Sequence, residues 1–466
     1  MKYQLTLLAS VACAVSLVLL TACAPIPKLA DPAQPIEATK LGLVDAKQAE
    51  IDARWWTGFH DETLNGLVER ALAENPSLAA ARARIERAQA MADAAGAAER
   101  PVIGAGADWS RQRISDHGFF PEPFAGEVYN NMNLGVGASY NWDFFGKHKA
   151  EIESALGSRR AAEMDAAAAR LSLATQVSRA YLGLARVQAQ AELLHQQLDD
   201  RQLALDLVRQ RTAAGLDNQQ DLRTAETPLP DLRRQQVALN EQATLLRNQL
   251  AALTVQPAAS LSGVQPKLPE LLGIEGAPSL NLLGRRPDVQ AARWRVEAAT
   301  QQIKVAKAQF YPDVTLSAQY AFNATQFSKL LQAGSAAWSF GPALRVPLFD
   351  TGALRAQLKG KAADLDGAVA SYNGTVIEAV RDASDQLATL QSIKAQQDHT
   401  AQGLAAVEAA HGLARQRFEA GMGNKLAVLT LHSQVLSQQR GLLELRAQAL
   451  DAQVNLLRAL GGGVTN

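Results

Sequence analysis

The sequence has little of three things that often reveal a protein's class: cysteine, aromatic residues and net charge. Its 466 residues include two cysteines, Cys13 and Cys23, which are too few and too close together for a disulfide framework, and neither has a spacing that suits zinc. Aromatic residues make up 5% of the chain, which disfavours a core built on large rings and suits long helices rich in Ala, Leu and Gln. The 46 basic residues balance 46 acidic ones, so the chain lacks the positive charge that binders of nucleic acid or of anionic membrane surfaces need.

The histidines give no sign of catalysis. They show no metal-binding pair at helical spacing and no Ser/His/Asp order. The seven positions are His60, His117, His148, His195, His399, His411 and His432. We interpret His432 as a helix-surface residue. The sequence therefore predicts no catalytic residue, no metal site and no cofactor, and an enzyme is kept as a rival class.

The first residues predict export to the cell envelope. An apolar run over residues 7–20 is too short for a transmembrane helix of roughly 20 apolar residues, so we interpret residues 1–22 as a secretion signal. A small residue before Cys23 resembles the bacterial lipobox, in which the cysteine thiol is acylated; the alternative is an incidental cysteine after an ordinary signal. Ala24, in place of aspartate, favours the outer membrane, and several prolines predict an extended, lipidated tether over residues 23–55.

The rest of the sequence contains two similar halves. Pro76 and Pro101 bracket one predicted helix, and Pro287 and Pro312 bracket another at the same offset, because 287 − 76 and 312 − 101 both equal 211. Such an agreement of residue type and order points to duplication of one unit.

A second similarity lies farther along each half. Residues 209–215 read RQRTAAG and residues 415–421 read RQRFEAG, and an asparagine follows each glycine by three positions. We therefore predict two tandem repeats, residues 56–260 and 286–466, joined by a linker over residues 261–285.

Each half contains two segments in which apolar and polar residues alternate. These segments predict β-strands over about 102–112 and 132–144 in the first half, and over about 313–323 and 336–348 in the second. Such alternation is typical of an outer-membrane barrel, although a soluble antiparallel sheet with one buried face shows it too; the export signal favours the membrane. Because four strands cannot close a barrel, copies must combine: two copies would supply eight strands and three would supply twelve.

Long proline-free segments predict two helical hairpins, over residues 147–253 and 353–460. Each first helix ends at a glycine, Gly215 or Gly421, as a left-handed helix cap requires. Pro228 and Pro230 must bend or break the returning helix of the first hairpin, and the second has no proline there. The composition suits coiled-coil packing, and a dimeric rod unrelated to a pore is the alternative.

The chain as a whole resembles the TolC-like outer membrane efflux family, in its lipoprotein (NodT-type) branch. The resemblance covers essentially the whole chain after the signal. The residues that carry it are Cys23, Trp55-Trp56, Asn75-Pro76, Arg286-Pro287-Asp288, the run from Ala306 to Pro312, Gly215, Gly421 and the run from Ala459 to Gly462.

This resemblance implies an α+β membrane protein, mostly long α-helices with four transmembrane strands per protomer. It implies a homotrimer, whose twelve-stranded β-barrel in the outer membrane continues as a twelve-helix α-barrel into the periplasm. The implied function is a passive exit duct of a tripartite efflux system, which receives drugs or toxic compounds from an inner-membrane pump of RND or MFS type through a periplasmic adaptor. The alternatives are the exit duct of a type I protein-secretion system and a non-transporting structural lipoprotein.

The resemblance also assigns roles to the hairpin tips. Adaptor docking falls on Gly215, Leu216, Gly421 and Met422, and the periplasmic constriction falls on the start of the returning helices.

In the second half, Leu426 keeps an apolar constriction position, and Thr430 stands where relatives carry a carboxylate. In the first half, Asp217 and Asp221 are one helical turn apart, which predicts one shared helix face. They either line the constriction or stabilise the positive end of the helix dipole.

Overall fold

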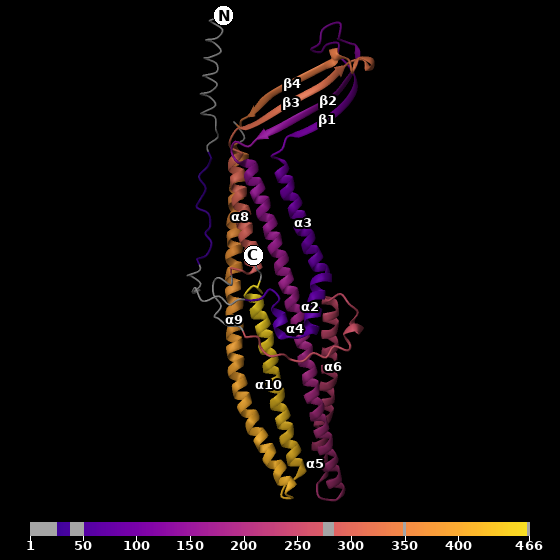
Figure 1. Cartoon of the computed structure of the whole chain (residues 1–466), viewed down its shortest axis with the longest axis vertical. Coiled ribbons are helices and arrows are strands. Elements are labelled where there is room, and N and C mark those ends of the chain that lie inside the picture. Colours follow the sequence, from indigo (N-terminus) through magenta and orange to yellow (C-terminus); the bar gives the residue numbers. More distant parts are fainter. Residues whose placement is uncertain (1–25, 38–50, 274–283, 348–350, 464–466) are drawn as a thin grey trace. The chain divides into compact units, whose positions relative to one another are not determined.

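The structure is a computed structural model that describes residues 26–37, 51–273, 284–347 and 351–463 (Figure 1). The signal predicted over residues 1–22 and the lipidation site predicted at Cys23 lie outside the described residues. No helix in the described ranges combines the length and the apolar character needed to cross a membrane.

The chain folds into two compact units, and each draws on both halves of the sequence. Unit 1 consists of the described parts of Met1–Pro35, Ile85–Ala162 and Ala292–Tyr372. Unit 2 consists of the described parts of Ile36–Arg84, Glu163–Ala291 and Asn373–Asn466. The repeats 56–260 and 286–466 therefore describe a symmetry of the sequence. Their use as domain bounds stays a prediction.

A four-stranded antiparallel sheet forms the upper part of unit 1 in Figure 1. Its strands follow one another in chain order: β1 (Val102–Arg113), β2 (Val128–Trp142), β3 (Asp313–Ala324) and β4 (Ala336–Arg345). The two halves of the sequence meet at the centre of the sheet, where β2 pairs with β3. Short 3-10 turns η4 (Phe327–Lys329) and η5 (Ala333–Ser335) lie between β3 and β4.

Two strands differ from their predicted bounds. The strand predicted over 132–144 begins earlier, at Val128, because residues 128–131 pair with the end of β1. It ends at Trp142 because Asp143 accepts hydrogen bonds from the backbone N–H groups of Lys147 and Lys149, at 2.7 and 3.0 Å, and so caps the following helix. The strand predicted over 336–348 ends at Arg345, opposite the first residue of β3, so no partner strand extends beyond it.

The helices begin and end largely where proline and glycine direct them. α3 (Pro76–Ala97) and α8 (Pro287–Ala308) both start at a proline, whose missing N–H costs nothing in a first turn. The two longest helices are α4 (Lys147–Ala213) and α9 (Thr351–Glu419).

The returning helices of the two hairpins differ from each other. The second hairpin returns in the unbroken α10 (Lys425–Ala459), whereas the first returns in two helices, α5 (Gln219–Glu226) and α6 (Pro228–Leu253). The predicted interruption at Pro228 is therefore confirmed.

The core of unit 2 gathers around α4. The turn η2 (Trp55–Phe59) and α2 (Glu62–Glu74) pack against one face of α4, together with residues of α6 and α10 and Leu261 of η3 (Ala258–Leu261). Most α4 residues in this cluster recur at helical spacing, namely Leu173, Ala174, Val177, Ala180, Tyr181, Leu184 and Val187, and Leu182 joins them from the border of this face. Removing a fully buried leucine side chain such as Leu184 from water contributes about 1.5–3 kcal/mol.

The Arg-Pro-Asp motif of the second half closes the start of α8 within unit 2. The buried Arg286 guanidinium donates two hydrogen bonds to the Asp288 carboxylate, at 3.0 and 2.7 Å, and lies 3.6 Å from Asp382 of α9. It also donates to the Ala459 carbonyl at the end of α10, at 3.4 Å. One motif thus connects the start of α8, the middle of α9 and the end of α10.

The described N-terminal residues of unit 1 pack against its helices. Ile26 and Leu29 pack beside Phe310 and Leu358, and the Ala33 N–H donates to the Asp366 carboxylate at 2.9 Å. These residues contain no regular secondary structure, because the prolines around them supply no helix-continuing N–H groups.

Candidate functional sites: the exposed sheet and the two helix tips

One face of the sheet is apolar across all four strands and remains exposed. Cross-strand pairing puts alternate residues on this face, for example Trp338 opposite Tyr320 and Tyr320 opposite Val136. Its apolar members are Ile103, Ala105, Ala107, Trp109, Val128, Met132, Leu134, Val136, Ala138, Tyr140, Trp142, Val314, Leu316, Ala318, Tyr320, Phe322, Ala324, Ala336, Trp338, Phe340, Pro342 and Leu344. Met132 is the buried member, and toward the β1–β2 loop the same face carries Arg111, Arg113 and Asn130. Ile103 is 76% exposed, Trp338 78% and Phe340 68%. An exposed apolar patch of this extent is typical of a surface that contacts lipid or another protein.

The opposite face of the sheet carries small and polar residues. Asp108 accepts a hydrogen bond from the Asn133 side chain at 3.3 Å, and Asn141 donates to Asp313 at 3.1 Å. Gly135 lies against the neighbouring strand, where a Cβ would come within 2.6 Å of the Ala321 Cβ. This face is therefore suited to contact with water while the other is not.

Both outer edges of the sheet are open within the described chain. The strand order β1-β2-β3-β4 leaves one side of β1 and one side of β4 without a strand partner. Each edge thus presents a row of backbone N–H and C=O groups that a further strand would satisfy. A sheet with an exposed apolar face and two open edges is incomplete as a single copy.

Aromatic rings gather at the end of the sheet where β2 leaves and β3 enters. Trp142 stacks on Phe144 with ring centroids 5.5 Å apart, and Phe145 stacks on Tyr311 at 4.5 Å. Such rings at strand ends are typical of the boundary between hydrocarbon and water in membrane barrels.

The two hairpin tips share one backbone construction. Gly215 and Gly421 have positive φ angles of 74° and 71°. The N–H of Leu216 donates to the Arg211 carbonyl at 2.9 Å, and the N–H of Met422 donates to the Arg417 carbonyl at the same distance. This pattern closes the carbonyl end of each long helix.

Each tip exposes a large apolar side chain at its turn. Leu216 is 71% exposed and Met422 is 70% exposed. The structure therefore places the four predicted docking residues, Gly215, Leu216, Gly421 and Met422, together at two matching turns.

The first tip is closed by an ion pair. The Arg211 guanidinium donates to both oxygens of Asp217, each at 2.8 Å, and the hydrogen bond from Arg211 lowers the pKa of that carboxyl. Asp217 precedes Asn218, the N-cap of α5, and so lies outside the helix. The prediction that Asp217 and Asp221 share one helix face is therefore wrong, because the turn places one of them before the first helical residue.

Asp221 belongs to a capping box. Its backbone N–H donates to the Asn218 side chain at 3.0 Å, and its carboxylate accepts the Asn218 N–H at 3.2 Å. The side chain is exposed near the positive end of the α5 dipole. This geometry matches the predicted role in stabilising a helix start.

The second tip is closed by packing instead of by charge. A Cβ at Gly423 would come within 2.8 Å of the Phe418 backbone nitrogen, so the chain passes directly against the helix it has just left. The Lys425 ammonium lies 5.4 Å from the centre of the Phe418 ring. Leu426 is half-buried, and its N–H donates to the Asn424 cap at 2.9 Å.

Thr430 has a counterpart in the first hairpin. Its hydroxyl donates to the Leu426 carbonyl at 2.9 Å, as the Thr224 hydroxyl donates to the Gln220 carbonyl at 2.8 Å. Both residues are exposed and lie nine positions after their tip glycine. Equivalent positions of the two hairpins thus carry the same residue type.

A polar cluster that the sequence did not predict links three helices of unit 2. The Nδ1 atom of His432 lies 2.5 Å from the Asp200 carboxylate, and its ring stacks on His411 with centroids 5.1 Å apart. Burial lowers the pKa of His411, and the neighbouring His432 lowers it further. The His432 side chain is 36% exposed, so it lies partly at the helix surface as interpreted, and α10 turns its ring toward Asp200 of α4 and His411 of α9. In the described ranges, no group of three or more His, Cys, Asp or Glu residues could hold a metal ion.

Known proteins share both the sequence pattern and the fold. A family profile described as "Outer membrane efflux protein" matches residues 67–255 and 280–462. The multidrug resistance outer membrane protein MdtP of Escherichia coli K12 is 30% identical over 463 residues, which cover 96% of this chain and 95% of that protein. The fusaric acid resistance protein FusA of Burkholderia cepacia is 40% identical over 313 residues, 66% of this chain and 59% of that protein.

Solved structures agree with this similarity. The outer membrane protein VceC of Vibrio cholerae superimposes with a TM-score of 0.82 at 34% identity, over 88% of this chain and 99% of that one. The outer-membrane channel OprN gives a TM-score of 0.82 at 27% identity, over 94% and 99%. Since the profile matches most of both halves, this chain belongs to the outer membrane efflux protein family.

Proposed function

We propose that this chain is one protomer of a trimeric outer-membrane duct, the exit component of a tripartite system that exports drugs or other toxic small compounds. The observation that carries the proposal is the open four-stranded sheet with its exposed apolar face. The names of MdtP, a multidrug resistance outer membrane protein, and of OprN, an outer-membrane channel, support the same class of function.

The physical argument rests on the sheet edges. Inside a bilayer, each unpaired backbone N–H or C=O group costs several kcal/mol, because hydrocarbon offers it no hydrogen-bond partner. The open edges of β1 and β4 must therefore each pair with another strand. Pairing β4 of one copy with β1 of the next satisfies both edges. Three copies supply twelve strands, which is enough to close a membrane barrel, and the small polar face then lines its interior.

The remaining site assignments are part of this proposal. The exposed Leu216 and Met422, held at fixed turns by Gly215 and Gly421, would dock on a periplasmic adaptor that connects the duct to an inner-membrane pump of RND or MFS type. Asp217, Asp221, Leu426 and Thr430 would surround the constriction near these tips. Acylation of Cys23 would anchor each copy in the outer membrane.

A pair of arginine substitutions on adjacent residues of β4 tests the duct. Trp338→Arg places a charge on the apolar face, where an arginine costs up to about 2–4 kcal/mol in a membrane barrel, so we expect loss of the trimer and of channel activity. Ser339→Arg places the same charge on the polar face and should retain both. Trimer content after detergent extraction and conductance in planar bilayers are the measurements. An unsubstituted protein that is monomeric and does not conduct would overturn the proposal.

The docking assignment has its own test. Leu216→Asp combined with Met422→Asp should abolish crosslinking to the adaptor and drug resistance, while the conductance of the isolated duct stays unchanged. Leu413→Asp is a matched control, since Leu413 is also an exposed leucine but lies two turns before the second tip. Undiminished crosslinking of the double variant would remove the tips from the docking surface.

A further inference from the structure

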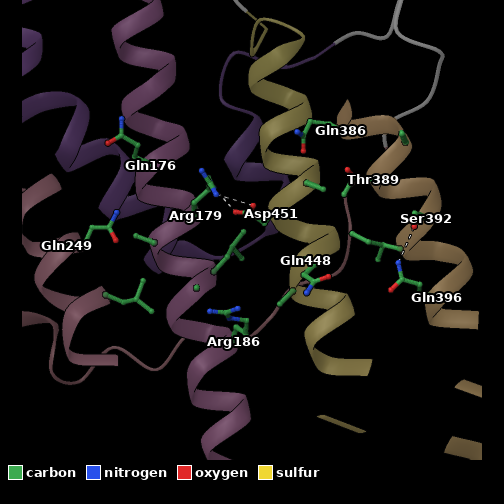
Figure 2. Close-up of a pocket in the computed structure, with 18 residues that line it drawn as sticks. Gln176, Arg179, Arg186, Gln249, Gln386, Thr389, Ser392, Gln396, Gln448 and Asp451 are labelled. Carbon is green, nitrogen blue, oxygen red and sulfur yellow. Dashed lines mark hydrogen bonds and ion pairs between the residues drawn. The ribbon is translucent and has the colours of Figure 1, made fainter. Parts of the chain in front are cut away.

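Unit 2 contains a concave surface of mixed polar and apolar lining that the tips and the sheet do not explain. It encloses about 870 Å³ between residues of α4, α6, α9 and α10 (Figure 2). Five glutamines line it, Gln176, Gln249, Gln386, Gln396 and Gln448. Figure 2 shows their side chains beside Arg179, Arg186 and Asp451.

The two arginines of this surface lie on the face of α4 that points away from the core of unit 2, and Ala180 and Leu182 border both regions. Val177, Tyr181 and Leu184 pack into the core with η2 and α2. Arg179 and Arg186 are two helical turns apart on the other face and line the concave surface. The layer formed by α4, α6, α9 and α10 therefore has one side covered by η2 and α2 and one hollow side that carries the arginines and glutamines. In the ring that the proposed duct requires, the hollow side would face the axis, because η2 and α2 occupy the other side.

The charged residues that line this surface are Arg179, Arg186 and Asp451, and Glu444 beside the lining completes a second ion pair. The Arg179 guanidinium donates to both oxygens of Asp451, at 2.6 and 3.1 Å. The Arg186 guanidinium donates to Glu444 at 3.1 Å, and the other Glu444 oxygen accepts the Gln190 amide at 2.7 Å. The side chains of both arginines and both carboxylates are 31–48% exposed, so both pairs are in contact with solvent.

We infer that this surface is a charge-balanced collar in the lumen of the duct, where Asp451 and Glu444 mask two arginines of each protomer so that compounds of either charge can pass. The inference rests on the proposed duct. Two arginines in each of three copies would give six cations around one axis, a field that would retain anions if nothing offset it. The glutamine amides add hydrogen-bond donors and acceptors but no net charge. They therefore hydrate the lumen wall without favouring cations or anions.

Removal of the masking carboxylates tests the collar. In planar bilayers under a KCl gradient, Asp451→Asn with Glu444→Gln should shift the reversal potential toward that of chloride, and each single variant should shift it part of the way. Adding Arg179→Gln and Arg186→Gln to the double variant should restore the original potential. Arg186→Gln alone should shift the potential toward that of potassium, and it tests the collar even where the double variant does not fold.

Glu69→Gln is the matched control. Glu69 also pairs with an arginine, Arg54, and is exposed, but it lies on α2, on the covered side of the layer. It should leave the reversal potential unchanged. An unchanged potential in the conducting Asp451 and Glu444 variants, or an equal shift from Glu69→Gln, would overturn the collar while leaving the duct standing. Loss of conductance in the unsubstituted protein would instead overturn the duct itself.

Discussion

The two hairpin tips have the same backbone and different side-chain chemistry. Both end a long helix with a glycine at positive φ and begin the returning helix at an asparagine cap. The first then adds the Arg211–Asp217 ion pair and a capping box, and its returning helix breaks before Pro228. The second has Gly423 packed against the Phe418 backbone and continues as one helix.

This difference separates what the turn requires from what each copy has added. The glycine lets the turn pair the last carbonyl groups of one helix, and the asparagine pairs the first N–H groups of the next. Both residues are required because unpaired backbone groups at helix ends are costly. The residues between them need only fill the remaining space. One copy does this with charge and the other with close packing, so the two tips should respond differently to the same perturbation.

A proline moved from the first hairpin to the second should have the largest effect. Gln434 lies in α10 at the position equivalent to Pro228, since 228 + 206 equals 434. Gln434→Pro removes a hydrogen bond from an unbroken helix and should lower the free energy of unfolding by about 3 kcal/mol. Pro228→Ala, the reverse change, should stabilise the protein slightly. Thermal unfolding followed by circular dichroism measures both, and equal effects of the two changes would show that the break in the first hairpin is not due to its proline.

Exchange of one tip residue should have the next largest effect. Gly423→Asp brings the residue of the first tip into the second, where even its Cβ meets the Phe418 backbone. We expect a loss of about 1–3 kcal/mol, as for overpacking, although Arg417 is available as a partner. Asp217→Gly should cost less, because it removes one half-buried ion pair and creates no clash. Local hydrogen exchange at the two tips should show this asymmetry, and similar losses at both would mean that their packing is alike.

Substitution of the tip glycines should affect both tips equally. Gly215→Ala and Gly421→Ala each place a Cβ in the left-handed region, which costs about 1–2 kcal/mol. Gly412→Ala is the control, because Gly412 lies inside α9 and no atom lies near the Cβ that alanine would add. This substitution should raise the free energy of unfolding, since alanine favours the helix more than glycine does. Unequal losses from the two alanines would show that the shared backbone is not equally strained.

A fall in pH should have the smallest effect and should act on the first tip alone. Because Arg211 lowers the pKa of Asp217 in the folded chain, the pair stabilises this tip above the ordinary aspartate pKa of about 3.9. That stabilisation is lost as the pH falls from there through the lowered pKa. Hydrogen-exchange protection, corrected for intrinsic rates, should decrease at residues 211–221 and stay constant at residues 417–427. Asp217→Asn should remove the difference.

The elements built from local rules were predictable. Proline at the first turn of α3 and α8, glycine after α4 and α9, and alternation in the strands all act within a few residues, so the chain order alone reveals them. Errors arose where a side chain left its local pattern. Asp143 turns from the end of β2 to cap α4, and Asp217 turns back to Arg211 instead of joining a helix.

Contacts between helices were not predictable from one sequence. Asp200 and His432 are separated by 232 positions, and Arg179 and Asp451 by 272, and nothing near either residue announces its partner. Amphipathic spacing predicts which face of α4 is buried, but it does not identify the helix opposite. The histidine cluster and the charge-balanced collar therefore became visible only in the structure, where α4 packs against α10.

The sequence was sufficient for the family, the number of strands and the position of both tips, because these follow from backbone chemistry repeated in two halves. The pairing of β2 with β3, the masking of Arg179 and Arg186, and the contrast between the tips needed the folded chain. The physical reason is that a backbone hydrogen bond or a helix cap involves neighbours in sequence. A cross-helix ion pair depends instead on the rotation and register of two long helices, which only their packed cores establish.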